Sequence, residues 1–504
     1  MKKMLPFLFA FCLSVLMAPV PATAREVTLT ILFTGDHHGQ LDPVRDPKGS
    51  DLVGGVSRRM ALIEKIRQEV GPAHVVLVDC GGLIDGTPFS ELSRGAADCE
   101  AYHLMGYDAV CLGENDFDYG TKSIVEYRRQ FGLPWVAANV NRGGQPFMRA
   151  YILKSTGVRV GIIGFADPET PSKVGRVVTQ GLTFNSPGLV AKGLHSIFKK
   201  DADIFIALTR QGLDDAKKFA KDNTFLHVVI SGKGSEPSKD PIVSTNRDGS
   251  LKGPILCQPG PRGLYLGRLD LVVNGHRDLK TRTSAYDITS YHYQVIPITA
   301  DLPEDPKMTA LLQKYHDRLS DKPLDEALTK VTGDLTGRNQ GDSLVGEIAV
   351  DALRNEAHTQ IALLPNQTFR PVFKTGMLTR ENLYEICPSE GEVIVLDVPG
   401  HVLRDALATS QAQKGQDGFL QVSGLTVEGQ GNDMKVVVDG EPLNNKHRYL
   451  VAVNDFLAGG GAGYESFRAI HSRRKTTLTV RTLLEEALKS KPSWGQADMD
   501  VRWK

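Results

Sequence analysis

Short, continuous runs of apolar residues recur along the first half of the chain, and each is followed by a glycine-rich or polar turn and then an amphipathic segment. Runs of this length predict buried strands of an α/β fold. In such folds, ligands bind where the strands end at their carboxyl edge, so a site is expected in the turns. The expected strands cover residues 27–33, 75–78, 109–112, 135–138, 158–165, 204–208, 227–230 and 265–273.

The second half of the chain opens on a different pattern. Pro303-Glu304-Asp305-Pro306 precedes an amphipathic run at residues 308–319, and Pro306 suits the first turn of a helix, where its missing amide hydrogen costs nothing. The pattern predicts a linker helix within residues 299–326, between an N-terminal domain at 25–298 and a C-terminal domain at 327–504. Residues 343–357 show helical spacing inside the second domain.

The N-terminus has the three parts of a cleavable secretory signal. Lys2 and Lys3 precede an apolar run at residues 4–20, and Ala22-Thr23-Ala24 ends the segment. We expect residues 1–24 to be removed near Ala24 and the protein to be exported to the periplasm or the extracellular space. The alternative is a retained membrane anchor, but the small residues favour cleavage. No later segment is apolar for long enough to span a bilayer.

Length and charge narrow the class of protein. A chain of 504 residues is too long for one hydrophobic core. Its 59 basic and 59 acidic residues balance, and no local basic patch stands out, so a nucleic-acid partner is not expected.

Five cysteines remain after the expected cleavage. They are scattered without a C-x-x-C pair, so a zinc ribbon has no support, and an odd number leaves at least one unpaired. Two of them end apolar runs and are expected to be small core residues. The five are Cys80, Cys99, Cys111, Cys257 and Cys387, of which Cys80 and Cys111 end the runs.

The first turn carries candidate chemistry. Asp36 and His38 follow the first expected strand, and a carboxylate and an imidazole two residues apart can both bind a metal such as manganese or zinc. A polar surface turn is the alternative. The other turns form an ordered series that is more specific than any single member: G-G-V-S-R-R at 54–59, D-C-G-G-L-I-D-G-T-P-F-S at 79–90, G-E-N-D-F-D-Y-G at 113–120, L-T-R-Q-G at 208–212 and I-S-G-K-G-S at 230–235.

This series resembles the secreted 5'-nucleotidase family, a branch of the calcineurin-like metallophosphoesterases that includes periplasmic UDP-sugar hydrolases. The resemblance runs along nearly the whole mature chain. It implies an N-terminal metallophosphoesterase-like β-sandwich flanked by helices, a linker helix, and an α+β C-terminal domain of the 5'-nucleotidase type that holds the nucleoside.

The resemblance also implies a two-metal site, from which this chain departs. Asp36 and His38 match two of the family's ligands, but Gly82 stands where a bridging aspartate is expected. Glu114 stands where the family has an asparagine ligand, and Asn115 replaces its catalytic histidine.

Three further histidine ligands of the family correspond to Arg210, Lys233 and Ser235. Arg210 and Lys233 would place fixed cations where the family places metals, facing Asp36 and Glu114. Unselected change at an inactive site is the alternative. Two alternatives remain for the cofactor: one divalent metal, or no metal. The donors available for one metal ion are Asp36, His37, His38, Asp85, Glu114 and Asp116. Asp116 and Asp118 could instead cap the helix that follows, and the two cations could hold an anion without any metal.

In the C-terminal domain, Phe419 and Phe456 match the family's two aromatics that sandwich the nucleobase, and Arg370 matches an arginine of the same pocket. A core position is the alternative for each ring. Ala462 stands in place of the aspartate that holds the ribose, which weakens the case for a nucleotide ligand.

Three hypotheses follow. We favour an exported binding or accessory protein for a nucleotide-like or anionic small molecule. The second is a metal-dependent phosphoester hydrolase with an altered, mononuclear site built on Asp36, His38 and Glu114. The third is a structural or partner-binding role. Residue chemistry favours the first, because a fold does not determine a function.

Overall fold

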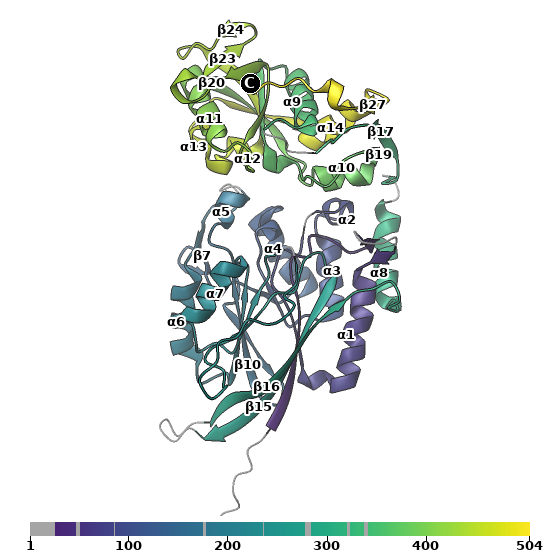
Figure 1. Ribbon diagram of the computed structural model, residues 1–504, viewed down its shortest axis with the longest axis vertical. Coiled ribbons are helices and arrows are strands. Elements are labelled where there is room, and N and C mark those ends of the chain that lie inside the picture. The colour runs from purple at the N-terminus through teal and green to yellow at the C-terminus, as the bar shows by residue number, and fades with distance from the viewer. Residues whose placement is uncertain are drawn as a thin grey trace, which may run out of the picture.

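The computed structural model describes residues 26–46, 51–84, 86–174, 178–234, 236–277, 284–319, 323–336 and 341–504. The expected signal segment, Asp85 and Ser235 lie outside them. Two lobes are visible, joined on one side through α8 (Pro306–Leu319) (Figure 1). The helix begins at Pro306, and the Asp305 side chain accepts hydrogen bonds from the amides of Lys307 and Met308.

Two mainly parallel sheets form the N-terminal domain. The first has the order β16-β15-β1-β4-β5-β6, and the second has the order β14-β13-β12-β10-β9. The bounds in the first are β1 Glu26–Thr34, β4 Val75–Asp79, β5 Ala109–Cys111, β6 Trp135–Val136, β15 Tyr265–Arg277 and β16 Ser284–Pro297. Those in the second are β9 Tyr151–Ser155, β10 Arg159–Phe165, β12 Ile204–Thr209, β13 Val228–Ser231 and β14 Ile255–Cys257.

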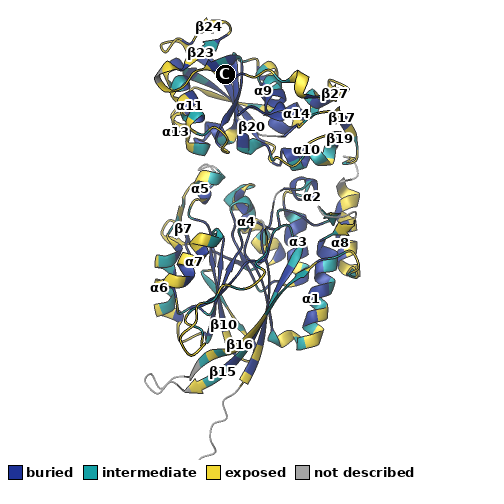
Figure 2. Ribbon diagram, viewed as in Figure 1, coloured by how far each residue is buried: buried dark blue, intermediate teal, exposed yellow. Residues whose placement is uncertain are grey.

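The two sheets face each other across one apolar core. Ile31 and Val78 of the first sheet and Ile162 and Ile206 of the second belong to the same buried cluster, which confirms the expected sandwich. Helices α1 (Val56–Val70) and α3 (Ala96–Met105) cover the outer face of the first sheet, together with α8, and α6 (Pro187–Phe198) and α7 (Leu213–Asp222) cover that of the second (Figure 1). Figure 2 shows the sheets as the buried centre of this lobe.

The C-terminal domain is built around a five-stranded sheet with the order β21-β18-β25-β20-β26. Its strands are β21 Leu420–Ser423, β18 Ile361–Pro365, β25 Arg448–Asn454, β20 Glu392–Pro399 and β26 Arg473–Thr479. Helices α9 (Leu344–Ala357), α11 (Gly400–Ala412) and α14 (Val480–Lys489) pack on it. Ser343 caps α9 by accepting a hydrogen bond from the Gly346 amide. The α+β expectation is confirmed.

Smaller elements complete this domain. A sheet with the order β19-β17-β27 joins Gly376–Thr379, Ala327–Val331 and Ser493–Trp494, and another with the order β22-β23-β24 joins Leu425–Glu428, Lys435–Val438 and Glu441–Pro442. The short helices α10 (Arg380–Ile386) and α12 (Asp455–Ala458) lie on the side that faces the N-terminal domain (Figure 1).

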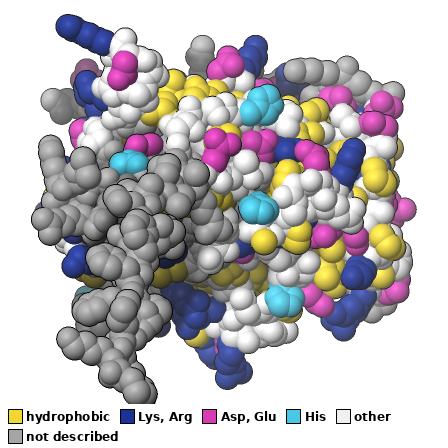
Figure 3. Space-filling model, turned by 90° about the horizontal axis from the view of Figure 1, so that it is seen from below, with side chains coloured by type: hydrophobic (Ala, Val, Ile, Leu, Met, Phe, Trp, Pro, Cys, Tyr) yellow, Lys and Arg dark blue, Asp and Glu magenta, His cyan; other side chains and the backbone are white. Residues whose placement is uncertain are grey.

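The positions of the cysteines and of the charged side chains can be compared with the sequence predictions. All five described cysteines are free and buried, and Cys80 and Cys111 lie in the core between the sheets, as expected. Both acidic and basic side chains are scattered over the face shown in Figure 3. Among the described residues, no helix has the length and apolarity needed to cross a membrane.

Candidate functional site

The site lies where the parallel strands of both sheets end. The turn after β1 is held against the turn after β4, because the Asp36 amide donates to the Gly81 carbonyl and the His38 amide donates to the Gly82 carbonyl, both at 2.9 Å. Asp36 and His38 adopt left-handed backbone angles, with φ of 56° and 51°. Non-glycine residues rarely adopt these angles, and they persist only where the surrounding structure holds them. Such strained positions cluster at functional sites, so this turn is a candidate site.

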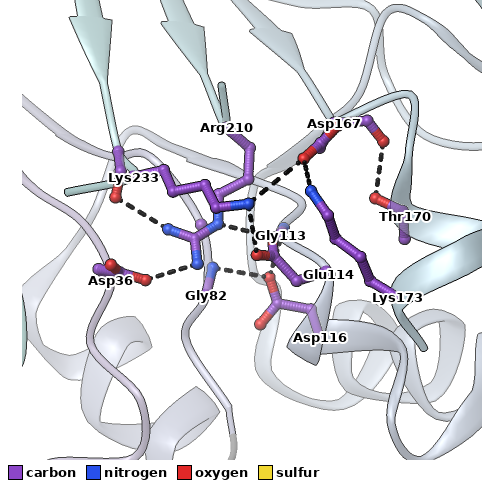
Figure 4. Close-up of polar contacts among 12 residues, drawn as sticks. Asp36, Gly82, Gly113, Glu114, Asp116, Asp167, Thr170, Lys173, Arg210 and Lys233 are labelled. Atoms are coloured by element: carbon purple, nitrogen blue, oxygen red, sulfur yellow. Dashed lines mark hydrogen bonds and ion pairs between the residues drawn. The ribbon is translucent and has the colours of Figure 1, made fainter. Parts of the chain in front are cut away.

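Arg210, at the end of β12, is the centre of the site (Figure 4). Its Nη2 lies 2.5 Å from Oδ1 of Asp36, its Nε lies 2.9 Å from Oε2 of Glu114, and its Nη1 donates to the Gly232 carbonyl at 2.8 Å. The side chain is only 1% exposed. A buried guanidinium with all three nitrogens engaged is held in a single orientation.

The charges in this cluster stabilise each other. Burial alone would raise the pKa of Asp36, but the Arg210 guanidinium and His38 outweigh it and hold that pKa well below its ordinary range. Burial likewise opposes the charged form of Glu114, and Arg210 and Lys233 lower its pKa. The pKa of Arg210 is raised by the two carboxylates in spite of burial. All three groups are therefore charged at neutral pH.

A second branch extends from Glu114 toward the C-terminal domain. Lys233 Nζ lies 3.6 Å from a carboxylate oxygen of Glu114 and 3.6 Å from one of Asp167, and Lys173 Nζ lies 2.5 Å from Asp167 (Figure 4). Sequence reasoning missed Asp167 and Lys173. Asp167 carries the same signal as the other candidates, because it lies in the turn that follows the apolar strand β10.

Gly82 makes room for Arg210. A Cβ atom added at Gly82 would lie 2.7 Å from Nη2 of Arg210 and 3.2 Å from Oδ1 of Asp36, and Gly82 has φ of 73°. The guanidinium therefore fills the space that a side chain at position 82 would need. An aspartate at 82 and an arginine at 210 exclude each other in this arrangement.

The remaining donors do not fit a divalent metal. Nε2 of His38 is 2.7 Å from Oδ1 of Asp36, and the same oxygen binds Arg210, while Glu114 binds Arg210 and Lys233. Within the described ranges, no group of three or more His, Cys, Asp or Glu side chains is placed to hold a metal ion. A guanidinium stands between the two carboxylates that a mononuclear site would need.

Asp116 has a structural role that differs from helix capping. Its carboxylate accepts hydrogen bonds from the amides of Gly82, Leu83, Ile84 and Gly113, at 2.7 to 3.2 Å. Burial raises its pKa to about 6. The residue ties the turn after β4 to the turn after β5, which positions Gly82 and Glu114.

His37 lies apart from its neighbours Asp36 and His38. The imidazole is fully buried, 3.7 Å from a carboxylate oxygen of Asp98 and tilted against the Tyr102 ring. Burial lowers its pKa well below the ordinary value, so the ring is neutral. The structure therefore places the His37 ring against Asp98 and Tyr102 and not with the Arg210 cluster.

A cavity of about 250 Å³ lies between the domains, next to the charged cluster. Asn115 and Lys173 line it from the N-terminal side, and Arg370, Asn454 and Phe456 line it from the C-terminal side. Asp118 belongs to the same lining. Phe419, by contrast, is 0% exposed and packs on Trp503 with ring centroids 4.8 Å apart. The structure does not bring the two predicted aromatic rings to one cavity.

Comparisons with known proteins identify the class. Residues 326–469 match the family described as 5'-nucleotidase, C-terminal domain. The chain is 26% identical to a 5'-nucleotidase of Bos taurus, over 88% of this chain and 85% of the relative, and 24% identical to protein UshA of Yersinia enterocolitica, over 95% and 94%.

Solved structures agree along the whole fold. A 5'-nucleotidase precursor from Thermus thermophilus is 25% identical, with a TM-score of 0.77, over 95% of this chain and 99% of that one. The sulfate thiohydrolase SoxB of Thermus thermophilus, at 18% identity and a TM-score of 0.68 over 94% and 96%, shares the fold.

The fold and the matched domain define a two-domain protein with the architecture of the 5'-nucleotidases. The chain is a 5'-nucleotidase-like protein with a 5'-nucleotidase C-terminal domain, which confirms the resemblance read from the turns.

Proposed function

We propose that this protein is an exported 5'-nucleotidase-like binding or accessory protein that has at most weak hydrolytic activity. One observation carries the proposal: the buried Arg210 guanidinium bridges Asp36 and Glu114. Two-metal hydrolysis needs bridging carboxylates and open coordination positions. Here, the carboxylates are already bound to a fixed cation that cannot be deprotonated.

The charge balance supports the same conclusion. Three cations, Arg210, Lys233 and Lys173, lie within 4.0 Å of the carboxylates of Asp36, Glu114 and Asp167, and Lys173 also pairs with the exposed Glu169. Each carboxylate of low exposure in this cluster therefore already has a cation beside it, unlike the unpaired carboxylates that attract a divalent cation. Introducing a metal would also bring it against the guanidinium, and like charges at short range repel strongly in a buried site.

The side chains that line the inter-domain cavity indicate the kind of ligand that it could bind. Lys173 and Arg370 bring positive charge to its two sides, Asn115 and Asn454 bring amide groups, and Phe456 presents an aromatic ring. Cations with amides suit an anionic group, and a ring suits a flat apolar or heterocyclic one. We infer a small molecule of nucleotide-like or anionic character as the ligand.

A second function is favoured by a different observation. The relatives named 5'-nucleotidase align over most of this chain, and Asp36 and His38 remain in the first turn. On this alternative, Asp36, His38 and Glu114 would hold one divalent metal for phosphoester hydrolysis, and Arg210 would have to leave its position between the carboxylates.

Metal content and turnover separate the two functions. The mature protein is analysed for bound metal and assayed with AMP and 4-nitrophenyl phosphate in the presence of Mn²⁺, Zn²⁺ or Co²⁺. We expect substoichiometric metal and turnover near the uncatalysed rate, together with calorimetric binding of AMP that weakens at least tenfold in Arg370→Ala. Arg474→Ala, an exposed arginine on β26, is the matched control.

Two outcomes would overturn the proposal. Two tightly bound metals with rapid turnover would establish a hydrolase. Absence of binding for AMP and for inorganic phosphate would remove the ligand class and leave a structural role.

A further inference from the structure

A groove on the N-terminal domain lies apart from the inter-domain cavity. It has a volume of about 670 Å³ and is formed by the last turns of α4 (Gly120–Phe131) and by the hairpin of β7 (Val140–Arg142) and β8 (Gln145–Pro146). Asp118, before α4, lines the inter-domain cavity, whereas Arg128 and Arg129 lie in the last turn of α4. At 1.5 Å of rise per residue, the two places are separated by about 15 Å along the helix.

Three arginines line this groove without any acidic residue. The full lining is Val125, Arg128, Arg129, Arg142, Gln145, Pro146 and Phe147. No carboxylate of a described residue forms an ion pair with these arginines, whereas Glu126, on the same helix, pairs with Lys122. Three guanidinium groups around one concavity repel each other, so an anion between them would be stabilised by all three.

The helix terminus explains only part of this arrangement. Basic residues in the last turn of a helix interact favourably with its dipole, which accounts for Arg128 and Arg129. The helix dipole does not account for Arg142, because this residue belongs to the strand β7 and not to α4. Its guanidinium lies over the Phe147 ring, 4.7 Å from the centroid, at the same groove.

The floor of the groove is apolar. Phe147 is 9% exposed, Val125 is 44% exposed, and Pro146 lies beside them. Stacking on Phe147 orients Arg142, which lowers the entropy that its guanidinium would lose on binding an anion. A purely ionic ligand would leave the apolar floor unused, whereas a ligand with both an anionic group and an apolar body would contact both parts of the groove.

We propose that this groove is a binding site for an amphiphilic oxyanion, in which a phosphate, sulfate or sulfonate head is held by Arg128, Arg129 and Arg142 and an apolar body lies on Val125, Pro146 and Phe147. A soluble alkyl phosphate and the headgroup region of an acidic lipid share this chemistry. The site is independent of the proposed function, because it shares no residue with the Arg210 cluster or the inter-domain cavity.

The experiment is calorimetric titration of the mature protein with three probes: hexyl phosphate, inorganic phosphate, and phosphatidylcholine vesicles containing phosphatidate. Hexyl phosphate should bind the wild-type protein at least tenfold more tightly than inorganic phosphate does. Arg129→Glu and Arg142→Glu should each weaken binding about tenfold to a hundredfold, the effect of losing one charge-assisted hydrogen bond and adding a like charge. Arg474→Glu makes the same charge change in the other domain and should alter affinity less than twofold.

Each result decides the proposal. Arginine-dependent binding of hexyl phosphate supports it with a soluble ligand, and arginine-dependent binding of the vesicles alone supports it with the lipid headgroup as the source. Equal affinity for inorganic phosphate and hexyl phosphate would overturn the amphiphilic ligand. Binding that is the same in Arg129→Glu, Arg142→Glu and wild type, or no binding to any probe, would overturn the site.

Discussion

Two buried arginines hold different parts of this molecule, and their partners differ in kind. Arg210 lies inside the N-terminal domain and donates to two carboxylates at 2.5 and 2.9 Å. Arg481, on α14, donates to the carbonyls of Cys387 and Pro388 and lies 3.4 Å from Glu91 of the other domain. Both side chains are less than 10% exposed.

The difference indicates what each arginine does. Two close carboxylates of the same domain compensate the buried charge of Arg210. That cluster therefore does not depend on the position of the C-terminal domain. Arg481 keeps its carbonyl bonds in its own domain and has one longer ion pair across the boundary. Because Arg481 keeps both carbonyl acceptors when this longer ion pair separates, the contact can open at modest cost, which fits a joint between domains.

Removing Arg210 should have the largest effect on stability. Arg210→Met leaves Asp36 and Glu114 buried without their cation, and we expect a loss of about 3 to 5 kcal/mol in the free energy of unfolding, measured by urea denaturation. Arg210→Lys keeps the charge without the planar fork and should lose less. A loss below about 1 kcal/mol in Arg210→Met would show that the cluster is not the compensated network described above.

Filling the space at Gly82 should come next. Gly82→Ala places a Cβ against the Arg210 guanidinium and forces a left-handed backbone on alanine, so we expect a loss of about 2 to 4 kcal/mol in the same measurement. In the Arg210→Met background, the contact with the guanidinium disappears and only the backbone cost of about 1 to 2 kcal/mol remains. Additive losses in the double variant would contradict the steric link between the two positions.

Acid should weaken the Arg210 cluster through its carboxylates. Asp36 and Glu114 have folded pKa values below their ordinary 3.8 and 4.5. Their stabilisation is therefore complete above those ordinary values and is lost as the pH falls through the folded values. Between pH 5 and pH 3, Glu114→Gln should lose about 1 kcal/mol less stability than wild type. Glu356→Gln, an exposed carboxylate on α9, serves as the control, and equal pH slopes in all three proteins would refute the prediction.

The smallest effect on stability is expected at the inter-domain contact. Glu91→Gln removes the charge that faces Arg481 across the boundary. Arg481 keeps its two carbonyl acceptors and the carboxylate of Glu390, so the loss should be about 1 kcal/mol. Small-angle scattering should nevertheless show a larger radius of gyration, because the closed arrangement loses an ion pair. Glu390→Gln is the matched control, since Glu390 lies 3.7 Å from Arg481 within the same domain. Identical scattering for both variants would contradict the role of this contact.

Much of the fold follows from the sequence pattern alone. The apolar runs at residues 27–33, 158–165 and 204–208 correspond to β1, β10 and β12 within one or two residues, because buried strands need continuous apolar side chains. The turns with Asp36, Glu114, Arg210 and Lys233 could be found for the same reason, since they follow the apolar strands β1, β5, β12 and β13. The edge strands β9, β14 and β16 are not predicted, because shorter or more polar runs do not stand out from loops.

Only the tertiary structure decided which of these side chains meet. Arg210 and Asp36 are 174 positions apart, and the order of strands in two facing sheets brings them together. His37 and Phe419 look like site residues by position, but packing buries both elsewhere. Asp167 and Lys173 join the cluster through a neighbouring turn. A local pattern specifies an element and its turn, whereas the direction and partners of a side chain depend on the elements packed against it.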